Sequence, residues 1–175
     1  MQYQRIVHAS VYLSIMNPLE KIRSLGLDLP ASPKPQGWYV PVARSGALAF
    51  VSGQLPMRDG AVAVKGIVGE GVSLEDARAA ARLCLLNILA ALEGNGVSLA
   101  SVHRVIKLTG YVQSAPDFHD QPKVLNAASE LLTEIFGDAG RHARAAVGVN
   151  ALPLNAAVEI EAVFEVSEGK VEGGG

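Results

Sequence analysis

The sequence contains a single cysteine, Cys84, among its 175 residues. One thiol cannot form a disulfide within the chain, so a fold built on disulfide bridges is excluded. Cys84 falls in the apolar stretch 77–92, which predicts a small side chain in the core of a helix. A lone core thiol suits a reducing compartment, and residues 1–15 contain no clear small-residue cleavage site of a signal peptide. We therefore expect a cytoplasmic protein.

Charges and long apolar runs are also scarce. Charged residues make up 18% of the chain, and the formal net charge is -2 at pH 7. The basic residues are scattered rather than clustered, so no nucleic-acid partner is expected. No uninterrupted apolar run reaches the roughly 18 residues that a membrane span needs, so no membrane partner is expected either. Yet 49% of the residues are hydrophobic and the mean hydropathy is +0.25, which favours an oligomer that buries apolar surface between subunits.

The sequence lacks the usual motifs of metal, nucleotide and nucleophile sites. The four histidines lie far apart, and neither His-Glu-x-x-His nor Cys-x-x-Cys occurs, so we expect no metal and no cofactor. The glycines of residues 66–71 do not follow the strand, G-x-G-x-x-G and helix order of a dinucleotide site. Ser52 stands in Val-Ser-Gly-Gln, which is not a nucleophile elbow. His119 and Asp120 precede a predicted helix and are explained by turn and cap chemistry, so the role of His119 stays open.

What the sequence does contain is the periodicity of an α+β protein. Asn17 and Pro18 predict the start of a short helix over 17–25, and long helices are predicted from Ser73 to Gly94 and over 122–136. The predicted strands are 48–55, 61–64 after an Arg-Asp-Gly turn, 102–112, 143–149 and 158–166. The order ββαβαββ predicts a two-layer sandwich, with two long helices on one face of a mixed sheet. We divide the chain into an N-terminal extension (1–35), a main domain (36–167) and a flexible tail (168–175).

Charged residues stand inside the last two predicted strands. Both strands alternate with a period of two, and one face of each is apolar. Arg144 lies on the other face of the first strand, and Glu159 and Glu161 lie on the other face of the second. If the strands are close in one sheet, a fixed cation stands near two carboxylates. An ordinary surface ion pair explains the same pattern.

The order and spacing of these segments resemble the Rid/YjgF family of reactive imine and enamine deaminases, once labelled L-PSP endoribonucleases. The resemblance covers residues 39–166. It is carried by Gly37-Trp-Tyr39, Phe50-Val-Ser-Gly-Gln-Leu-Pro, Gly110-Tyr-Val, Asp117-Phe118, the helix with Asn126, Arg144-Ala-Ala-Val, Leu152-Pro153 and Glu159-Ile-Glu161-Ala. It implies a chorismate-mutase-like (YjgF-like) fold and a homotrimer with three clefts between its subunits.

The resemblance also implies a reaction and a site. The arginine at Arg144 would bind the carboxylate of a small 2-imino or 2-enamino acid, and the glutamate at Glu159 would lie near the water that attacks the imine carbon. These are the expected catalytic residues, because a guanidinium binds a carboxylate at two points and a carboxyl group can pass protons. The products would be a 2-keto acid and ammonia. Five further positions match residues that line the family's cleft: Tyr39, Ser52, Gly53, Asn126 and Ala146.

The chain departs from the family pattern in ways that indicate a divergent, longer branch. Ala146 stands where the family commonly has a cysteine, so no thiol takes part. Trp38 stands where a proline often precedes the tyrosine, and residues 1–35 are additional. Two alternatives to deamination remain, namely a non-catalytic carboxylate-binding or regulatory trimer and an endoribonuclease, against which the acidic net charge argues.

Overall fold

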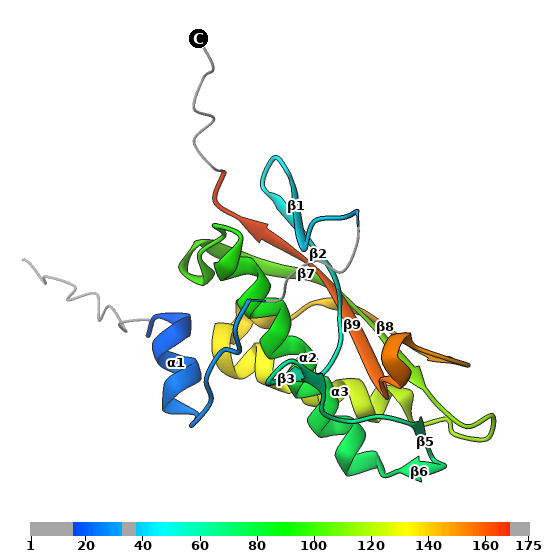
Figure 1. The fold of residues 1–175 in the computed structure, drawn as a ribbon. Helices are drawn as coiled ribbons and strands as arrows, with labels where there is room; N and C mark the ends of the chain where they lie inside the picture. The colour runs from blue at the N-terminus through cyan, green and yellow to red at the C-terminus, as the bar shows by residue number, and fades with distance from the viewer. Residues whose placement is uncertain (1–15, 33–37, 169–175) are drawn as a thin grey trace, which may run out of the picture.

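The computed structural model describes residues 16–32 and 38–168, and a five-stranded sheet forms its centre (Figure 1). The strand order is β1-β2-β9-β7-β8. The neighbours from β1 to β7 are antiparallel, whereas β7 and β8 are parallel, so the sheet is mixed as predicted. The bounds are Val42–Ser45 (β1), Leu48–Gln54 (β2), Val102–Gln113 (β7), Ala143–Val149 (β8) and Val158–Val166 (β9).

Two long helices, α2 (Leu74–Gly94) and α3 (Gln121–Phe136), cover one face of this sheet. The Ser73 hydroxyl caps α2 by accepting a hydrogen bond from the Asp76 backbone N–H at 3.0 Å. Gly137, with φ of 60°, ends α3. The two-layer α+β sandwich is therefore confirmed. No helix in the described ranges is long and apolar enough to cross a membrane.

The short elements follow local turn chemistry. Strands β3 (Met57–Arg58) and β4 (Ala61–Val62) form a hairpin at the predicted Arg-Asp-Gly turn, because Asp59 and Gly60 both adopt the positive φ that a tight hairpin turn needs. The predicted strand 61–64 is shorter than expected and lies outside the central sheet, where β1, which was not predicted, pairs with β2 instead. Two short paired strands and three 3-10 turns complete the described part of the chain and were not predicted: β5 (Ile67–Val68), β6 (Gly71–Val72), η1 (Leu99–Ser101), η2 (Gly137–Gly140) and η3 (Pro153–Asn155).

The short N-terminal helix, α1 (Pro18–Ser24), forms as expected. The Asn17 side chain accepts a hydrogen bond from the Leu19 backbone N–H at 2.9 Å, and Pro18 occupies the first turn. Ile22 on this helix is only 1% exposed and belongs to the main core, so α1 is packed into the fold and contacts α3. Residues 1–15 and the tail beyond 168 lie outside the described ranges.

The two faces of the sheet differ in character, and β9 shows the difference most clearly. Its alternate residues Val158, Ile160 and Ala162 are buried beneath the helices. Glu159 and Glu161 lie on the opposite, open face and are half-buried. Because paired residues on neighbouring strands share a face, this alternation assigns each residue of β7 and β8 to a side.

Candidate active site

Arg144 lies on the edge strand β8, on the helix-covered side of the sheet. Its partner on β7 is Leu108, which is completely buried beneath the helices. The guanidinium Nη1 donates one hydrogen bond to Asn126 Oδ1 and one to Ser129 Oγ, each at 3.0 Å. Both acceptors belong to α3, yet Arg144 remains solvent-exposed. Helix α3 therefore fixes one nitrogen of a guanidinium that is open to a ligand.

The predicted pairing of Arg144 with a glutamate on one face of the sheet is wrong within the chain. Strand β7 separates β8 from β9, and Glu159 and Glu161 pair with Tyr111 and Thr109 on the open face. The surface ion pair that explained the same pattern is wrong too, because Arg144 contacts no carboxylate in the described part of the chain. A charged side chain fits the helix side here because β8 is the last strand and solvent reaches its edge.

Glu159 lies on the open face beside strand β2. A β-carbon on Gly53 would overlap Glu159 Oε1, so the carboxylate fills the space that glycine leaves. Burial, and then the charge of Glu161, raise the pKa of Glu159 above its usual value. A raised pKa moves the proton exchange of a carboxyl group closer to neutral pH, which favours a role in proton transfer.

A bulge in β2 lies opposite Glu161 and contains two predicted site residues, of which Gly53 lies against the carboxylate of Glu159. Val51 pairs with Ala162 and Gln54 with Ile160, so Ser52 and Gly53 together oppose one residue of β9. Gln54 Nε2 donates to the Ser52 carbonyl at 3.1 Å and to its hydroxyl oxygen at 3.2 Å. The bulge therefore orients the Ser52 hydroxyl and brings the glycine backbone close to the carboxylate.

The predicted site residues thus form two sets in the chain. Asn126 and Arg144 are in contact on the helix side, and Ala146 lies on the same side because it pairs with Gly110, whose face packs on Leu125. Ser52, Gly53 and Glu159 gather on the open side. Tyr39 is 50% exposed and immediately precedes Val40, which lines an open-face hollow with Ser52.

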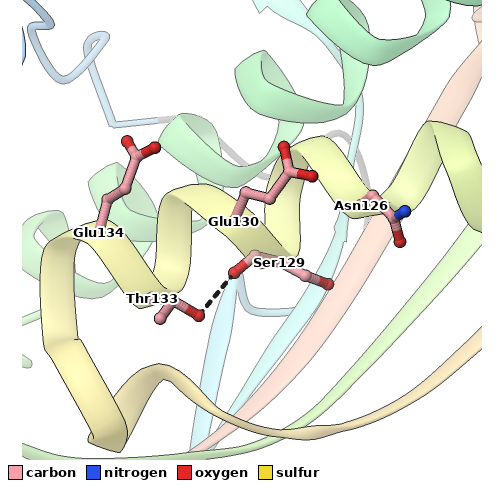
Figure 2. A pocket seen from close by; sticks show the side chains of 5 residues that line it. All are labelled: Asn126, Ser129, Glu130, Thr133 and Glu134. Carbon is pink, nitrogen blue, oxygen red and sulfur yellow. Dashed lines mark hydrogen bonds between the residues drawn. The ribbon is translucent and has the colours of Figure 1, made fainter.

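Two hollows accompany these sets. A groove of about 590 Å³ runs along α3, and Figure 2 shows its lining side chains projecting from this one helix: Asn126, Ser129, Glu130, Thr133 and Glu134. Arg144 contacts the first two of them. The second hollow, about 330 Å³ on the open face, includes Ser52 and Glu161 in its wall. Each set of site residues therefore has its own accessible space.

Sequence reasoning missed Ser129 and Tyr111 as site residues. Ser129 lies three residues after Asn126 on α3 and also accepts a hydrogen bond from Arg144. Residues three apart share one face of a helix, so the position of Asn126 could have indicated Ser129. Burial, the charge of Glu161 and a hydrogen bond with Glu161 raise the pKa of Tyr111. Its place beside Glu159 depends on β7 and β9 being neighbours, which the sequence does not reveal.

Cys84 is completely buried in α2, on the helix side of the sheet. Burial, followed by the charge of Glu159, raises the pKa of its thiol. Its Sγ lies 3.5 Å from the Val158 carbonyl oxygen. Among residues 16–32 and 38–168, no group of three or more His, Cys, Asp or Glu side chains could hold a metal ion.

The fold and these side chains define a two-layer α+β protein of the chorismate-mutase-like type. A family model described as "YjgF/chorismate mutase-like, putative endoribonuclease" matches residues 20–166. The chain therefore belongs to the YjgF family. The match begins inside the segment 1–35 that the sequence analysis separates as an extension, and that division of the chain stays a prediction.

Curated relatives span a range of names. Protein TCP17 of Trypanosoma cruzi is 41% identical over 147 residues, which are 83% of this chain and 92% of the relative. A protein of Dermatophagoides farinae named 2-iminobutanoate/2-iminopropanoate deaminase is 28% identical over 140 residues, 80% of this chain and 94% of the relative. The family thus includes a named imine deaminase.

Solved structures show the same fold. A protein of unknown function from Agrobacterium tumefaciens is 46% identical and has a TM-score of 0.79. The match covers 86% of this chain and 93% of the Agrobacterium chain. A putative endoribonuclease from Shewanella oneidensis is 31% identical and has a TM-score of 0.83. The match covers 86% of this chain and 99% of the Shewanella chain. E. coli TdcF, solved with bound serine, is 27% identical, with a TM-score of 0.58 over 78% and 94%.

Proposed function

We propose that this protein hydrolyses small 2-imino or 2-enamino acids to 2-keto acids and ammonia. The single observation that carries the proposal is the state of Arg144, whose Nη1 is fixed by α3 while the side chain stays exposed. A guanidinium held in this way offers its remaining N–H groups to a carboxylate, the group that all substrates of this class share. The relative named as an imine deaminase and the amino acid bound to TdcF support the same ligand class.

Glu159 would supply the proton transfers. Water adds to the imine carbon as Glu159 accepts a proton from it, and Glu159 returns a proton to the nitrogen. This first transfer gives a carbinolamine. Glu159 then takes the proton of the new hydroxyl and passes it to the amine, so the carbon–nitrogen bond breaks, ammonia leaves and the carbonyl forms, and the sum is imino acid plus water to keto acid plus ammonia. The raised pKa of Glu159 supports this role because both of its protonation states are then accessible closer to neutral pH. No step in this sequence requires a cofactor.

The proposed site lies between subunits of a homotrimer. Arg144 and Glu159 are on opposite sides of one sheet with β7 between their strands, so one small substrate cannot contact both within a chain. A neighbouring subunit would bring its own Glu159 set to Arg144, with Asn126 and Ala146 from one chain and Ser52 and Gly53 from the other. Tyr39 would line the same cleft. Exposed Phe50 (43%) and Val147 (44%) on the sheet offer apolar surface for such an interface.

A first experiment tests the reaction itself. Imino acids generated in solution by an amino-acid oxidase are offered as a panel, and ammonia and 2-keto acid release are followed with and without the protein. We expect faster release with the protein, and a rate equal to the protein-free rate for every imino acid would refute the proposal.

A second experiment tests the shared cleft by mixing two inactive variants. Arg144→Ala and Glu159→Gln chains are unfolded together and refolded in equal amounts. If each site takes Arg144 from one chain and Glu159 from its neighbour, about a quarter of the sites in random mixed trimers are intact. Recovery of about a quarter of wild-type turnover supports the shared cleft, and no recovery, with trimers verified by sedimentation, contradicts it.

The separation of Arg144 from Glu159 also favours a second candidate, a carboxylate-binding or regulatory trimer without catalysis. Such a protein needs only Arg144, Asn126 and the groove along α3. Pyruvate binding without ammonia release from any imino acid would distinguish it. The family description also names an endoribonuclease, but a net charge of -2 gives the protein no general electrostatic attraction for RNA.

A further inference from the structure

His142 lies in the chain between η2 and the strand that carries Arg144, and its ring contacts the middle of α3. It is half-buried, with Nδ1 2.7 Å from the Gly140 carbonyl oxygen and Nε2 3.0 Å from Ser129 Oγ. A carbonyl oxygen only accepts hydrogen bonds, so Nδ1 must carry the proton that fills this contact. In the neutral ring Nε2 is then an acceptor, and the Ser129 hydroxyl donates to it.

This assignment fixes the direction of the next hydrogen bond. With its proton turned to His142, Ser129 presents an oxygen lone pair to Arg144, whose Nη1 donates to it at 3.0 Å. Asn126 Oδ1 accepts the second Nη1 hydrogen at 3.0 Å. Both hydrogens of Nη1 are therefore used, and these two hydrogen bonds fix the orientation of the guanidinium plane.

The remaining donors of Arg144 are the N–H of Nε and the two of Nη2. One N–H on each of these nitrogens lies along the same edge of the guanidinium, and this parallel pair is the edge that binds a carboxylate at two points. We infer that Ser129 and His142 are positioning residues for Arg144, which keep its Nε/Nη2 edge free and aligned for the carboxylate of the ligand. The inference rests on the proposed function of Arg144 in carboxylate binding.

A structural role alone would give a different result. His142 also ties the turn η2 to α3, and Gly140 packs so closely on the backbone of Leu132 that it has no room for a side chain. If His142 served only this turn, its loss would lower the melting temperature without a selective effect on ligand affinity. A positioning role instead predicts weaker carboxylate binding, because a mobile guanidinium must be ordered when the ligand binds.

The test uses steady-state kinetics and pyruvate binding on Ser129→Ala, His142→Ala and His142→Gln in the full chain. Ser129→Ala and His142→Ala should raise KM and the pyruvate Kd roughly ten-fold, the size expected for a lost hydrogen bond to a charged group. The value of kcat should change much less, because the carboxylate is bound equally in the ground and transition states. His142→Gln should recover most of the affinity, since its amide oxygen can accept from Ser129.

The chain offers a matched control pair. His103 Nε2 lies 3.1 Å from Ser167 Oγ, near the end of β7 that does not pair with β8. His103→Ala removes a histidine–serine contact of the same kind away from Arg144, and its KM should equal that of the wild type. Adding Ser129→Ala to Arg144→Ala should weaken pyruvate binding no further, because the two residues act through one contact.

A ligand-free measurement separates failure of this inference from failure of the proposed function. In ¹⁵N-resolved spectra of the Arg144 side chain, the wild type should show distinct Nη1 and Nη2 signals, and Ser129→Ala and His142→Ala should merge them. Merged signals in the wild type, or wild-type KM and signals in both variants, would overturn the positioning role. Absent turnover with distinct wild-type signals that merge in the variants would refute the deaminase while supporting the positioning of Arg144.

Discussion

The carboxylate of Glu159 occupies the space that a β-carbon on Gly53 would need. Gly53 does not have a positive φ, so its backbone conformation is open to other residues. The neighbouring carboxylate, rather than the backbone dihedral angles, is what requires glycine there. The β2 bulge makes this approach possible by setting Ser52 and Gly53 against a single residue of β9.

Gly53→Ala should therefore displace Glu159 and reduce turnover about 100-fold, the effect of a misplacement of roughly 1 Å in a catalytic group. The carboxylate is half-buried and can move, so the melting temperature should change little. Gly110→Ala is the contrasting variant, because its β-carbon would overlap Leu125 in the core and cost about 1 to 3 kcal/mol. Turnover and thermal melts on both variants check the claim, and wild-type turnover in Gly53→Ala contradicts it.

Glu159→Gln should keep carboxylate binding but lose most turnover. The amide preserves the shape of the side chain yet cannot accept and return a proton, so kcat should fall about 100-fold or more while the pyruvate Kd stays near that of the wild type. Kinetics and calorimetry on one preparation separate the two effects. Full turnover would mean that Glu159 is structural or that Glu161 performs the proton transfer.

The same variant has a predicted effect on stability. Because the pKa of Glu159 is raised in the folded chain above its usual 4.5, ionising it opposes folding, and stability is lost as pH rises through the raised pKa. Glu159→Gln removes this loss, so its melting temperature should exceed that of the wild type at pH 7, with the difference vanishing below pH 4.5. Glu70→Gln, at an exposed position, removes one negative charge in the same way and serves as the control. A constant or reversed difference for Glu159→Gln would contradict the expectation.

The sequence predicted the elements well because their signals are local. Asn17 and Ser73 cap helices where expected, and the Asp59-Gly60 turn joins the hairpin as its composition indicated. Period-two alternation also identified β8 and β9. What it could not supply is the strand order, since inserting β7 between them is a long-range choice that no local pattern encodes.

The site was predictable only in part for the same reason. The alternation of apolar and polar residues predicted that Arg144 and Glu159 each stand on the less apolar side of their strand. It could not predict which face of the sheet that side belongs to. On β8 the small residues Ala145 and Val147 face the open side and Arg144 faces the helices, the reverse of β9. The contact between Arg144 and Ser129 depends on this choice and on the position of α3, so it required the structure.

Cys84→Ser should leave turnover within about two-fold of the wild type. The thiol is buried on α2, its raised pKa keeps it protonated, and a hydroxyl can donate to the Val158 carbonyl in its place. Burying a more polar group at this apolar position should lower stability by about 1 kcal/mol. Turnover is measured before and after treatment with a chelator as well, and a loss that one metal restores would reveal a site that the described residues do not show.

Arg144 gives the most decisive prediction, because geometry and charge can be separated there. Arg144→Ala should abolish imine hydrolysis, and Arg144→Lys should not restore it fully, since an ammonium cannot present two parallel N–H groups to a carboxylate. Losing such a charge-assisted contact costs about 2 to 5 kcal/mol, so the rate should fall by at least a factor of roughly 30.

The stability of these variants should hardly change, because Arg144 is exposed and its partners Asn126 and Ser129 can bind water instead. Ammonia release and thermal melting are therefore measured on the wild type, Arg144→Ala and Arg144→Lys in parallel. A large fall in melting temperature together with the lost rate would assign Arg144 to the fold, and normal turnover by Arg144→Ala would rule out the deaminase mechanism built on this side chain.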